Sequence, residues 1–428
     1  MPQVFLKVLL IVLPKGASVL LAAGLATMLS SCFSSRLVPR PGPGAEVGSK
    51  EFVAELGRVS DAPWQAGNEV KTLPNGASFF PRMLAAVKAA ERTITLETFA
   101  FVDAPVSRDF ARALAERAGS GVAVKVIFDN VGSAKAGEKN VKLMRAAGVE
   151  ICFYHPINIL RPRYSNNRTH RKILVVDGKV AFTGGAGFAH AWSGNAERKK
   201  KWRDTQYEIR GPAVARFQEA FRENWFELTG KELRGISYFP RLKAGGRDKV
   251  QVVFDDPWHP GTPIANGFVA AIKGARESLI LQQSYFVPNR RFRELLLAAA
   301  ARGVRVEVMV PDEGIDSEVT RHASQNHWAQ LLRGGVRIFQ YERTMIHGKL
   351  LVADGRFSIV GSANLDNRSF FINDEINLHV DSQEFAQEQL VMFRRDLKES
   401  REVTRENLRK FLAPGIKRFL ARFVESQL

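Results

Sequence analysis

The sequence predicts an α/β fold made of two tandem copies of one domain. A reactive pattern occurs twice with the same internal spacing: a histidine (His170 or His347), a lysine two positions on, four apolar residues and an Asp-Gly pair. The segments before each copy also resemble each other, and in both halves strand-like runs alternate with helix-like ones. Repetition indicates a duplicated domain, and this alternation favours a mixed β-sheet with helices on both faces.

The elements of the first half follow from its periodicity. It predicts a helix over 79–90, a strand over 93–101, a helix over 107–117 and a strand over 122–128. The second half repeats these and later segments: 268–281 repeats 83–96, 304–310 repeats 122–128, and 335–341 repeats 148–154. Because the likeness extends beyond the motifs, it supports duplication of the whole domain.

Each motif predicts a strand that ends in a tight turn. The aliphatic runs 173–176 and 350–353 are both followed by Asp-Gly, which is typical of hairpin turns. Since Asp177 and Asp354 fall in these turns, we interpret them as turn-forming or supporting groups and do not expect them to orient the histidines.

The histidine and lysine of each motif are expected to share one face of their strand, because side chains alternate along a strand. This places His170 beside Lys172, and His347 beside Lys349. An imidazole beside an ammonium group is a poor core pair but a good anion site, because lysine keeps three hydrogen-bond donors.

Two acids are candidates for orienting the histidines. A reactive imidazole works best when a carboxylate bonds its far nitrogen and selects one tautomer. Asp204 follows the first copy, just before the strand-like run 206–209, and Glu375 follows the second, just before 376–380. We expect each acid to orient the histidine of its own copy.

The double motif resembles the signature of the phospholipase D superfamily, in particular its bacterial cardiolipin synthase branch. The resemblance covers about residues 65–400 and is carried by the motifs and by segments around them: 166–172, 202–205, 210–214, 284–288, 361–370 and 373–377. It implies two tandem phospholipase D-like domains, each a mixed β-sheet flanked by helices, related by a pseudo-twofold axis with the site at their interface.

The resemblance also implies roles for individual residues. The catalytic set consists of the six motif positions His170, Lys172, Asp177, His347, Lys349 and Asp354. Ser362, Asn364 and Gly185 are expected to contact substrate. The first copy departs from the pattern, because Gly185 and Gly187 stand where the second has Ser362 and Asn364. The first half therefore lacks the asparagine side chain that would contact phosphate.

The implied chemistry is phosphoryl transfer through a phosphohistidine. One histidine attacks phosphorus, and the other protonates the departing alcohol and then deprotonates the incoming one. Lys172, Lys349 and Asn364 stabilise charge on the phosphoryl oxygens, so neither a metal nor a cofactor is implied. The pattern leaves open which histidine is the nucleophile.

The resemblance favours a phosphatidyltransferase that makes cardiolipin from phosphatidylglycerol. Three alternatives share parts of this pattern: a phospholipase D that hydrolyses phospholipids, a phospholipase D-like nuclease, and a non-catalytic lipid-binding scaffold.

The 428 residues are 45% hydrophobic and 25% charged, as in a globular protein, and the net charge is +18. This charge favours either an anionic membrane surface or nucleic acid as a partner. We favour the membrane because residues 1–32 resemble a lipoprotein signal and residues 411–428 form a basic amphipathic tail, as described below.

Residues 1–32 resemble a bacterial lipoprotein signal. Lys7 and Lys15 precede the apolar run 16–29, and Leu-Ser-Ser leads to Cys32 as the lipidated residue. This predicts a protein anchored to the cell membrane on its exported side, periplasmic or outer. An uncleaved anchor is the alternative, although the run is shorter than the ~20 residues that a membrane-spanning helix needs.

The remaining boundaries follow from composition. We expect a linker or an irregular packed arm over 33–62, the first domain over 63–240, the second over 241–410 and a basic amphipathic tail over 411–428. The apolar residues of the tail fall on one stripe: Leu412, Ile416, Phe419, Leu420 and Phe423. We expect this stripe to pack onto the domain, with a membrane interface as the alternative.

Four charged residues near the first motif have two interpretations each. Glu97 lies in an apolar strand, so it should face the site or meet a basic partner. Arg161, Arg163 and Arg168 precede the first histidine. Their guanidinium groups either bind phosphate or belong to a solvated loop.

Overall fold

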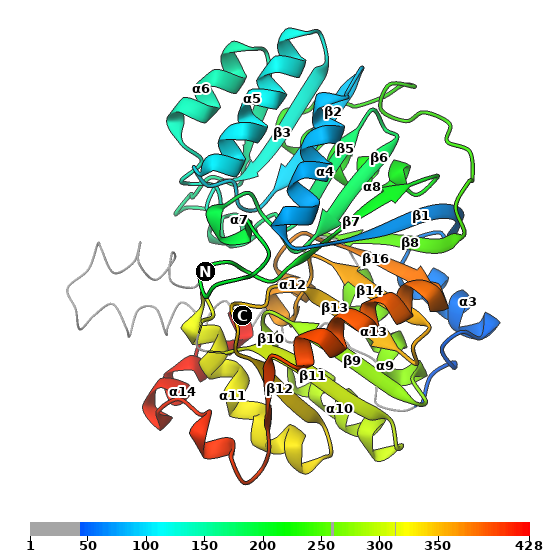
Figure 1. The fold of residues 1–428 in the computed structure, drawn as a ribbon, viewed down its shortest axis with the longest axis vertical. Coiled ribbons are helices and arrows are strands. Elements are labelled where there is room, and N and C mark those ends of the chain that lie inside the picture. Colours follow the sequence, from blue (N-terminus) through cyan, green and yellow to red (C-terminus); the bar gives the residue numbers. More distant parts are fainter. Residues whose placement is uncertain (1–42, 258–260, 313) are drawn as a thin grey trace.

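The computed structural model describes residues 43–257, 261–312 and 314–428. Figure 1 shows two halves, one above the other, each with strands covered by helices on both faces. The first half comprises α3 (Lys50–Val59), β1 (Gln65–Pro74), α4 (Gly76–Lys88), β2 (Thr93–Thr98), α5 (Pro105–Gly119), β3 (Ala123–Asp129), α6 (Glu138–Ala146), β4 (Glu150–Tyr154), α7 (Pro162–Asn166), β5 (Lys172–Val176), β6 (Val180–Gly184), η1 (His190–Trp192), β7 (Thr205–Arg210) and α8 (Val214–Thr229).

The second half repeats this arrangement and adds a tail. It comprises β8 (Asp248–Asp255), α9 (Pro263–Gly274), β9 (Ser278–Gln283), β10 (Phe286–Val287), α10 (Arg290–Ala301), β11 (Arg305–Pro311), α11 (Glu318–Arg333), β12 (Arg337–Tyr341), β13 (Lys349–Ala353), β14 (Phe357–Gly361), β15 (Leu365–Asp366), α12 (Asn367–Phe371), β16 (Glu375–Asp381), α13 (Gln383–Leu397), β17 (Ser400–Val403), η2 (Leu408–Lys410), α14 (Gly415–Arg422) and η3 (Glu425–Gln427).

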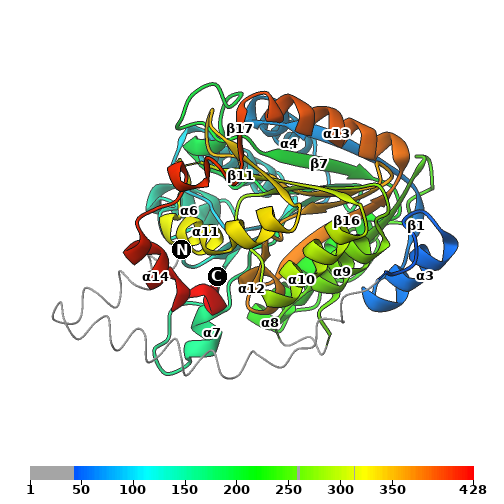
Figure 2. The same ribbon diagram turned by 90° about the horizontal axis from the view of Figure 1, so that it is seen from below.

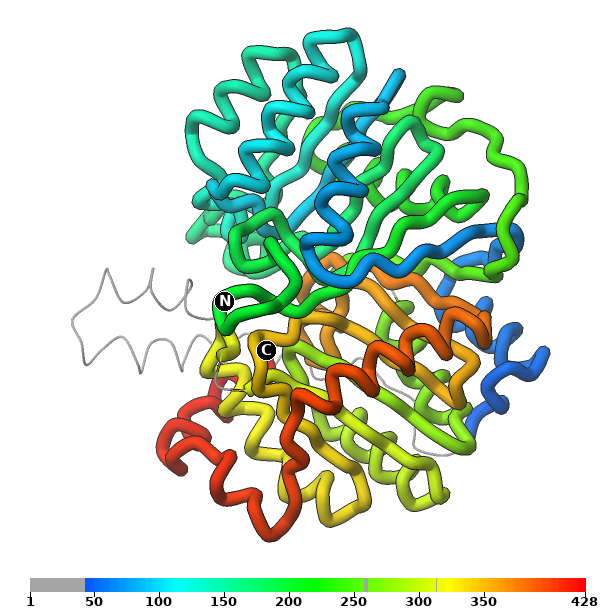
Figure 3. Tube along the Cα trace, in the orientation of Figure 1, coloured from blue at the N-terminus to red at the C-terminus, as the bar shows by residue number. Residues whose placement is uncertain are grey.

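One sheet of 15 strands runs through both halves of the described chain. Outward from a central β8–β1 pair, one side has the order β7-β6-β5-β2-β3-β4 and the other β16-β14-β13-β9-β11-β12. These orders correspond strand for strand. In Figure 3 the chain passes from one half, mostly cyan and green, into the other, mostly yellow to red. The duplication and the mixed α/β class are therefore confirmed, with the two expected sheets joined edge to edge.

The two motif strands are buried aliphatic elements that end in type I′-like turns. Every residue of β5 and β13 is buried. Asp177 and Gly178 have φ of 52° and 61°, and Asp354 and Gly355 have 52° and 60°. Two successive positive φ values match the twist of a tight hairpin, which is why Asp-Gly occurs there.

A shared hydrophobic cluster joins the halves behind the site. Ile173 and Val175 of β5 belong to the same core cluster as Leu350 and Val352 of β13. Because packed cores do not deform continuously, this cluster holds the two motif strands in one relative position.

The structure decides between the two alternatives for the segment before the first domain, and it corrects the expectation for the tail. Residues 43–62 are a packed arm instead of a linker: Ser49 caps α3, and Phe52 and Leu56, four residues apart, are buried against the second half. In the tail, α14 packs on α11 through Ala421, but Ile416 and Phe419 are 65% and 53% exposed. The apolar stripe faces outward because the opposite face of α14 makes the contact.

The lipoprotein segment 1–32, including Cys32, lies outside the described residues. Within the described ranges, none of the helices combines the length and the apolar character required to cross a membrane.

Candidate active site

A pocket of about 460 Å³ lies where the two halves meet, within the ~300–1,000 Å³ range of small-molecule sites. Both motif histidines line it, together with Lys172 and Gly185 from the first half and Asn364 from the second. The structure therefore brings together residues that are far apart in the sequence, as the duplicated motif predicted.

Each histidine is oriented by the acid of the other half, which corrects the expected pairing within each copy. Nδ1 of His170 lies 2.9 Å from Oε1 and 3.0 Å from Oε2 of Glu375. Nδ1 of His347 lies 2.8 Å from Oδ2 of Asp204. With Nδ1 bonded to an acid, Nε2 of each ring is the nitrogen left for chemistry.

Backbone bridges across the interface cause this crossed pairing. The amide N–H of His170 donates to the carbonyl of Asp374 at 2.9 Å, the residue before Glu375. The amide N–H of His347 donates to the carbonyl of Arg203 at 2.7 Å, the residue before Asp204. Each histidine thus enters the site beside the first residues of a strand from the opposite half.

Burial and neighbouring lysines lower the pKa of both imidazoles. Burial lowers the pKa of His170 to about 4, although Glu375 opposes this, and Lys172 adds to the lowering. The pKa of His347 is also lowered, first by burial and then by Lys349. Neutral imidazoles at ordinary pH can act as nucleophiles or bases.

The two lysines have different surroundings. Lys349 donates to Oγ of Ser284 at 2.7 Å and approaches Nε2 of His347 at 3.2 Å. Lys172 donates to the carbonyl of His170 and lies 5.6 Å from the ring centre of Phe99, which occupies the position of Ser284 in the repeat. Burial lowers the pKa of Lys172 to about 7 and that of Lys349 to about 8.

The two orienting acids are supported by different donors. Ser362 donates its hydroxyl to Oε2 of Glu375. In the first half, Gly185 replaces that serine, and the indole Nε1 of Trp192 donates to Oδ2 of Asp204 at 2.8 Å. Trp192 was not anticipated from the sequence, because no motif includes it.

Sequence comparison identifies the two halves as related domains. The family model described as "Cardiolipin synthase, PLD-like domain" matches residues 83–225 and 268–397. The chain belongs to this family. It is 33% identical to a cardiolipin synthase of Geobacillus kaustophilus (strain HTA426) over 75% of its own length, and 33% identical to cardiolipin synthase A of Pseudomonas aeruginosa (strain PAO1) over 85%.

The chain is shorter than these relatives. The match spans 64% of the Geobacillus protein and 74% of the Pseudomonas protein. Among solved structures, phosphatidylserine synthase of Haemophilus influenzae Rd KW20 has a TM-score of 0.66 at 13% identity, covering 89% of this chain and 100% of that one. Polyphosphate kinase of Porphyromonas gingivalis has a TM-score of 0.54 at 14% identity, covering 79% and 49%. At these identities the structural matches show the fold.

The motif aspartates do not reach the pocket, so their inclusion in the catalytic set is corrected. Asp177 accepts hydrogen bonds from the amides of Arg92 and Thr93, and Asp354 accepts them from Glu277 and Ser278. Both therefore close turns at the far end of the motif strands. Their interpretation as turn-forming groups is confirmed.

The small residues of the first motif are required by packing. A Cβ on Gly185 would lie 2.5 Å from Oδ1 of Asp204, and one on Gly187 would lie 2.8 Å from Cβ and O of Ala100. In the second half, Asn364 lines the pocket and its Oδ1 makes no hydrogen bond with the described residues. The Oδ1 acceptor of Asn364 is thus free to bind a ligand donor, whereas Gly187, at the equivalent position of the first half, has no side chain to offer.

The remaining charged candidates divide among the core, the exposed surface and the pocket. Glu97 is buried and accepts hydrogen bonds from Thr169 and Asn224, so it is a structural partner. Arg161 is exposed, whereas Arg168 is buried and lines the pocket. The described residues contain no cluster of three or more His, Cys, Asp or Glu side chains suited to a metal.

Proposed function

We propose that this protein is a phosphatidyltransferase that makes cardiolipin from phosphatidylglycerol through a phosphohistidine. The observation that carries the proposal is the pair of imidazoles, each bonded at Nδ1 to a buried carboxylate, in one pocket with the buried Lys172. Relatives named cardiolipin synthase support this substrate class.

The first step forms the covalent intermediate. Nε2 of His170 attacks the phosphorus of a phosphatidylglycerol, a P–N bond forms, and the P–O bond to the headgroup glycerol breaks. The glycerol leaves with the Nε2 proton of protonated His347, whose imidazolium is stabilised by the buried Asp204 carboxylate, and His347 becomes neutral. We assign the attack to His170 because its pKa of about 4 keeps it neutral, and because Glu375 contacts it through both oxygens.

The second step transfers the phosphatidyl group to another lipid. A headgroup hydroxyl of a second phosphatidylglycerol gives its proton to His347 and attacks phosphorus, while the P–N bond breaks and returns the electron pair to His170. Lys172, Lys349 and Asn364 stabilise the charge on the equatorial oxygens in both steps. The products are cardiolipin and glycerol.

The test is to incubate the purified protein with phosphatidylglycerol vesicles and, separately, with single-stranded DNA, both with a chelator. We expect cardiolipin and glycerol in equal amounts. Phosphatidic acid without cardiolipin would instead identify a hydrolase, and nicked DNA with unchanged lipid would identify a nuclease. Loss of all products in His170→Ala and His347→Ala excludes a contaminating activity.

We further propose that the protein works on an anionic membrane surface, anchored through Cys32 on the exported side of the cell membrane. The net charge of +18 supports an anionic partner. Exposed apolar residues lie on α14 and its C-cap (Ile416, Phe419, Leu420 and Phe423) and on the loop before α7 (Ile157, Ile159 and Leu160).

These two apolar groups lie on the same side of the molecule. Asn166 at the end of α7 donates to Oε1 of Gln427 in η3, directly after α14, at 3.0 Å. Figures 1 and 2 show α7 and α14 on one side in both views. Since Leu428 lines the pocket, this side is also next to the proposed site.

Fluorescence quenching tests the membrane contact. In Phe419→Trp, brominated lipids in phosphatidylglycerol vesicles should quench the new indole, whereas Val391→Trp, at an exposed apolar position on α13, should be unaffected. The six native tryptophans give the same background in both variants. Equal quenching of the two variants would contradict this orientation. Lipidation is tested separately by radiolabelled palmitate, which should be lost in Cys32→Ser.

A further inference from the structure

Beside the reacting centre, the pocket wall carries two arginines. Arg168 and Arg368 both line the pocket, one from each half. Arg368 donates from NH2 to the carbonyl of Asn166 at 2.7 Å and from NH1 to its side-chain oxygen at 3.1 Å. Its guanidinium is therefore held beside the segment that carries Arg168.

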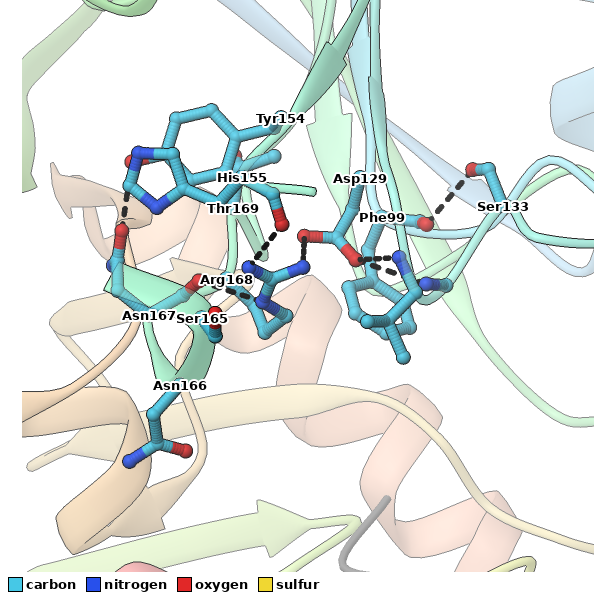
Figure 4. A network of polar contacts seen from close by, with 12 residues as sticks. Phe99, Asp129, Ser133, Tyr154, His155, Ser165, Asn166, Asn167, Arg168 and Thr169 are labelled. Carbon is cyan, nitrogen blue, oxygen red and sulfur yellow. Dashed lines mark hydrogen bonds and ion pairs between the residues drawn. The ribbon is translucent and has the colours of Figure 1, made fainter. Parts of the chain in front are cut away.

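Arg168 is fixed in place but not saturated. It is 3% exposed, its Nε donates to the carbonyl of Asn167, and its NH2 donates to the carbonyl of His155, both at 2.6 Å. NH1 makes no hydrogen bond with the described residues, and its ion pair with Oδ2 of Asp129 is long, at 3.6 Å. Figure 4 shows this network, with Arg168 between the carbonyl of His155 and the Asp129 carboxylate.

The two guanidinium groups repel each other. The pKa of Arg368 is lowered to about 10, first by burial and then by the charge of Arg168, although Asp366 and Asp129 oppose this. Two like charges in one wall favour a bound anion, and a guanidinium fork matches the oxygens of a phosphate.

We propose that Arg168 and Arg368 form a second phosphate subsite, which binds the unreacting phosphodiester of the acceptor lipid. This assignment of a ligand rests on the proposed function, whereas the existence of an anion site does not. In cardiolipin, six covalent bonds separate the two phosphorus atoms. Arg168 and His170, which would bind the two phosphates, are two residues apart and line the same pocket.

The subsite would select the acceptor. Water and glycerol carry no phosphate, so they gain nothing from the arginines, whereas phosphatidylglycerol is held with its hydroxyl near the phosphohistidine. Binding energy from a remote group would then favour transfer over hydrolysis.

The first test counts anion sites by calorimetry with inorganic phosphate on the full chain. We expect two sites in the wild type, and one in Arg368→Gln and in Arg168→Lys. Arg163→Gln, on the exposed face of the same segment, is the matched control and should keep two. One site in the wild type, or two in Arg368→Gln, would overturn the subsite even if the enzyme makes cardiolipin.

The second test compares acceptors. With phosphatidylglycerol as donor, the ratio of cardiolipin formation to transfer onto added ethanol should fall about tenfold or more in Arg368→Gln, since charge-assisted hydrogen bonds are lost. An unchanged ratio would contradict acceptor selection. Two phosphate sites in a wild type that transfers nothing would contradict the proposed function and leave the subsite standing.

Discussion

The two halves of the pocket hold their orienting carboxylates in place with different residues. In the second half, Ser362 supports Glu375, which orients His170; in the first half, Trp192 supports Asp204, which orients His347. Glutamate is one methylene longer than aspartate, so it leaves room for a serine Cβ, whereas Asp204 packs directly on Gly185.

This difference shows that duplication conserved the position of the carboxylate and not the residues that hold it. The serine and the longer acid form one matched set, and the glycine, the shorter acid and the indole form the other. A departure from the motif in one half is therefore compensated by a residue outside the motif.

The crossed pairing predicts the largest effects. Glu375→Gln and Asp204→Asn should each lower kcat/KM about 10³-fold or more, because the amide favours the wrong imidazole tautomer. Nitrogen-15 NMR should show the His170 ring changed by Glu375→Gln and the His347 ring changed by Asp204→Asn. If Glu375→Gln instead changed the His347 ring and Asp204→Asn changed the His170 ring, the crossed pairing would be wrong.

The packing of the first motif predicts the next effect. Gly185→Ala places a Cβ against the Asp204 carboxylate and the carbonyl of His347, at 2.5 and 2.8 Å. Displacing the acid should cost about 10²-fold in kcat at near-normal melting temperature. Gly119→Ala, where a Cβ meets no atom within 4 Å, is the control. Full activity in Gly185→Ala would show that the close contact is unimportant.

The two supporting donors should have similar, smaller effects. Trp192→Phe and Ser362→Ala each remove one hydrogen bond to an orienting acid, so we expect losses of about tenfold in kcat. Trp64→Phe removes an indole hydrogen bond to the carbonyl of Val53, far from the pocket, and should leave kcat unchanged. If Trp192→Phe is as active as Trp64→Phe, the Trp192 indole does not support Asp204 in the way that the Ser362 hydroxyl supports Glu375.

The lysines predict the smallest effect, in the pH profile of kcat/KM. Activity should rise as pH passes the His170 pKa of about 4, since the nucleophile must be neutral. It should fall at higher pH as His347, the general acid, loses its proton, and again between pH 7 and 8, where Lys172 (pKa about 7) and Lys349 (pKa about 8) lose theirs. Ser284→Ala removes an acceptor from the Lys349 ammonium, so the alkaline limb should move down by about half a pH unit.

Ser358→Ala provides the control for the pH profile. Its hydroxyl is buried in β14 and makes no hydrogen bond with the described residues. An alkaline limb that moves equally in both variants would show that Ser284 does not tune Lys349.

The sequence by itself determined the local structure of the site. Periodicity predicted the strands, Asp-Gly predicted the turns closed by Asp177 and Asp354, and the repeated spacing predicted that His170 and His347 share a pocket. The strands and turns depend on neighbouring residues, whose conformational preferences act over a few positions, whereas the shared pocket followed from the duplication.

Only the tertiary structure decided which acid meets which histidine, that Trp192 replaces a serine, that Arg168 faces the pocket and that the α14 stripe points outward. His170 and Glu375 are far apart in the chain, and their contact depends on how the halves join along the β8–β1 pair. Two related halves can satisfy the same local patterns with either pairing of acid and histidine. The packing between the halves therefore determines which pairing forms.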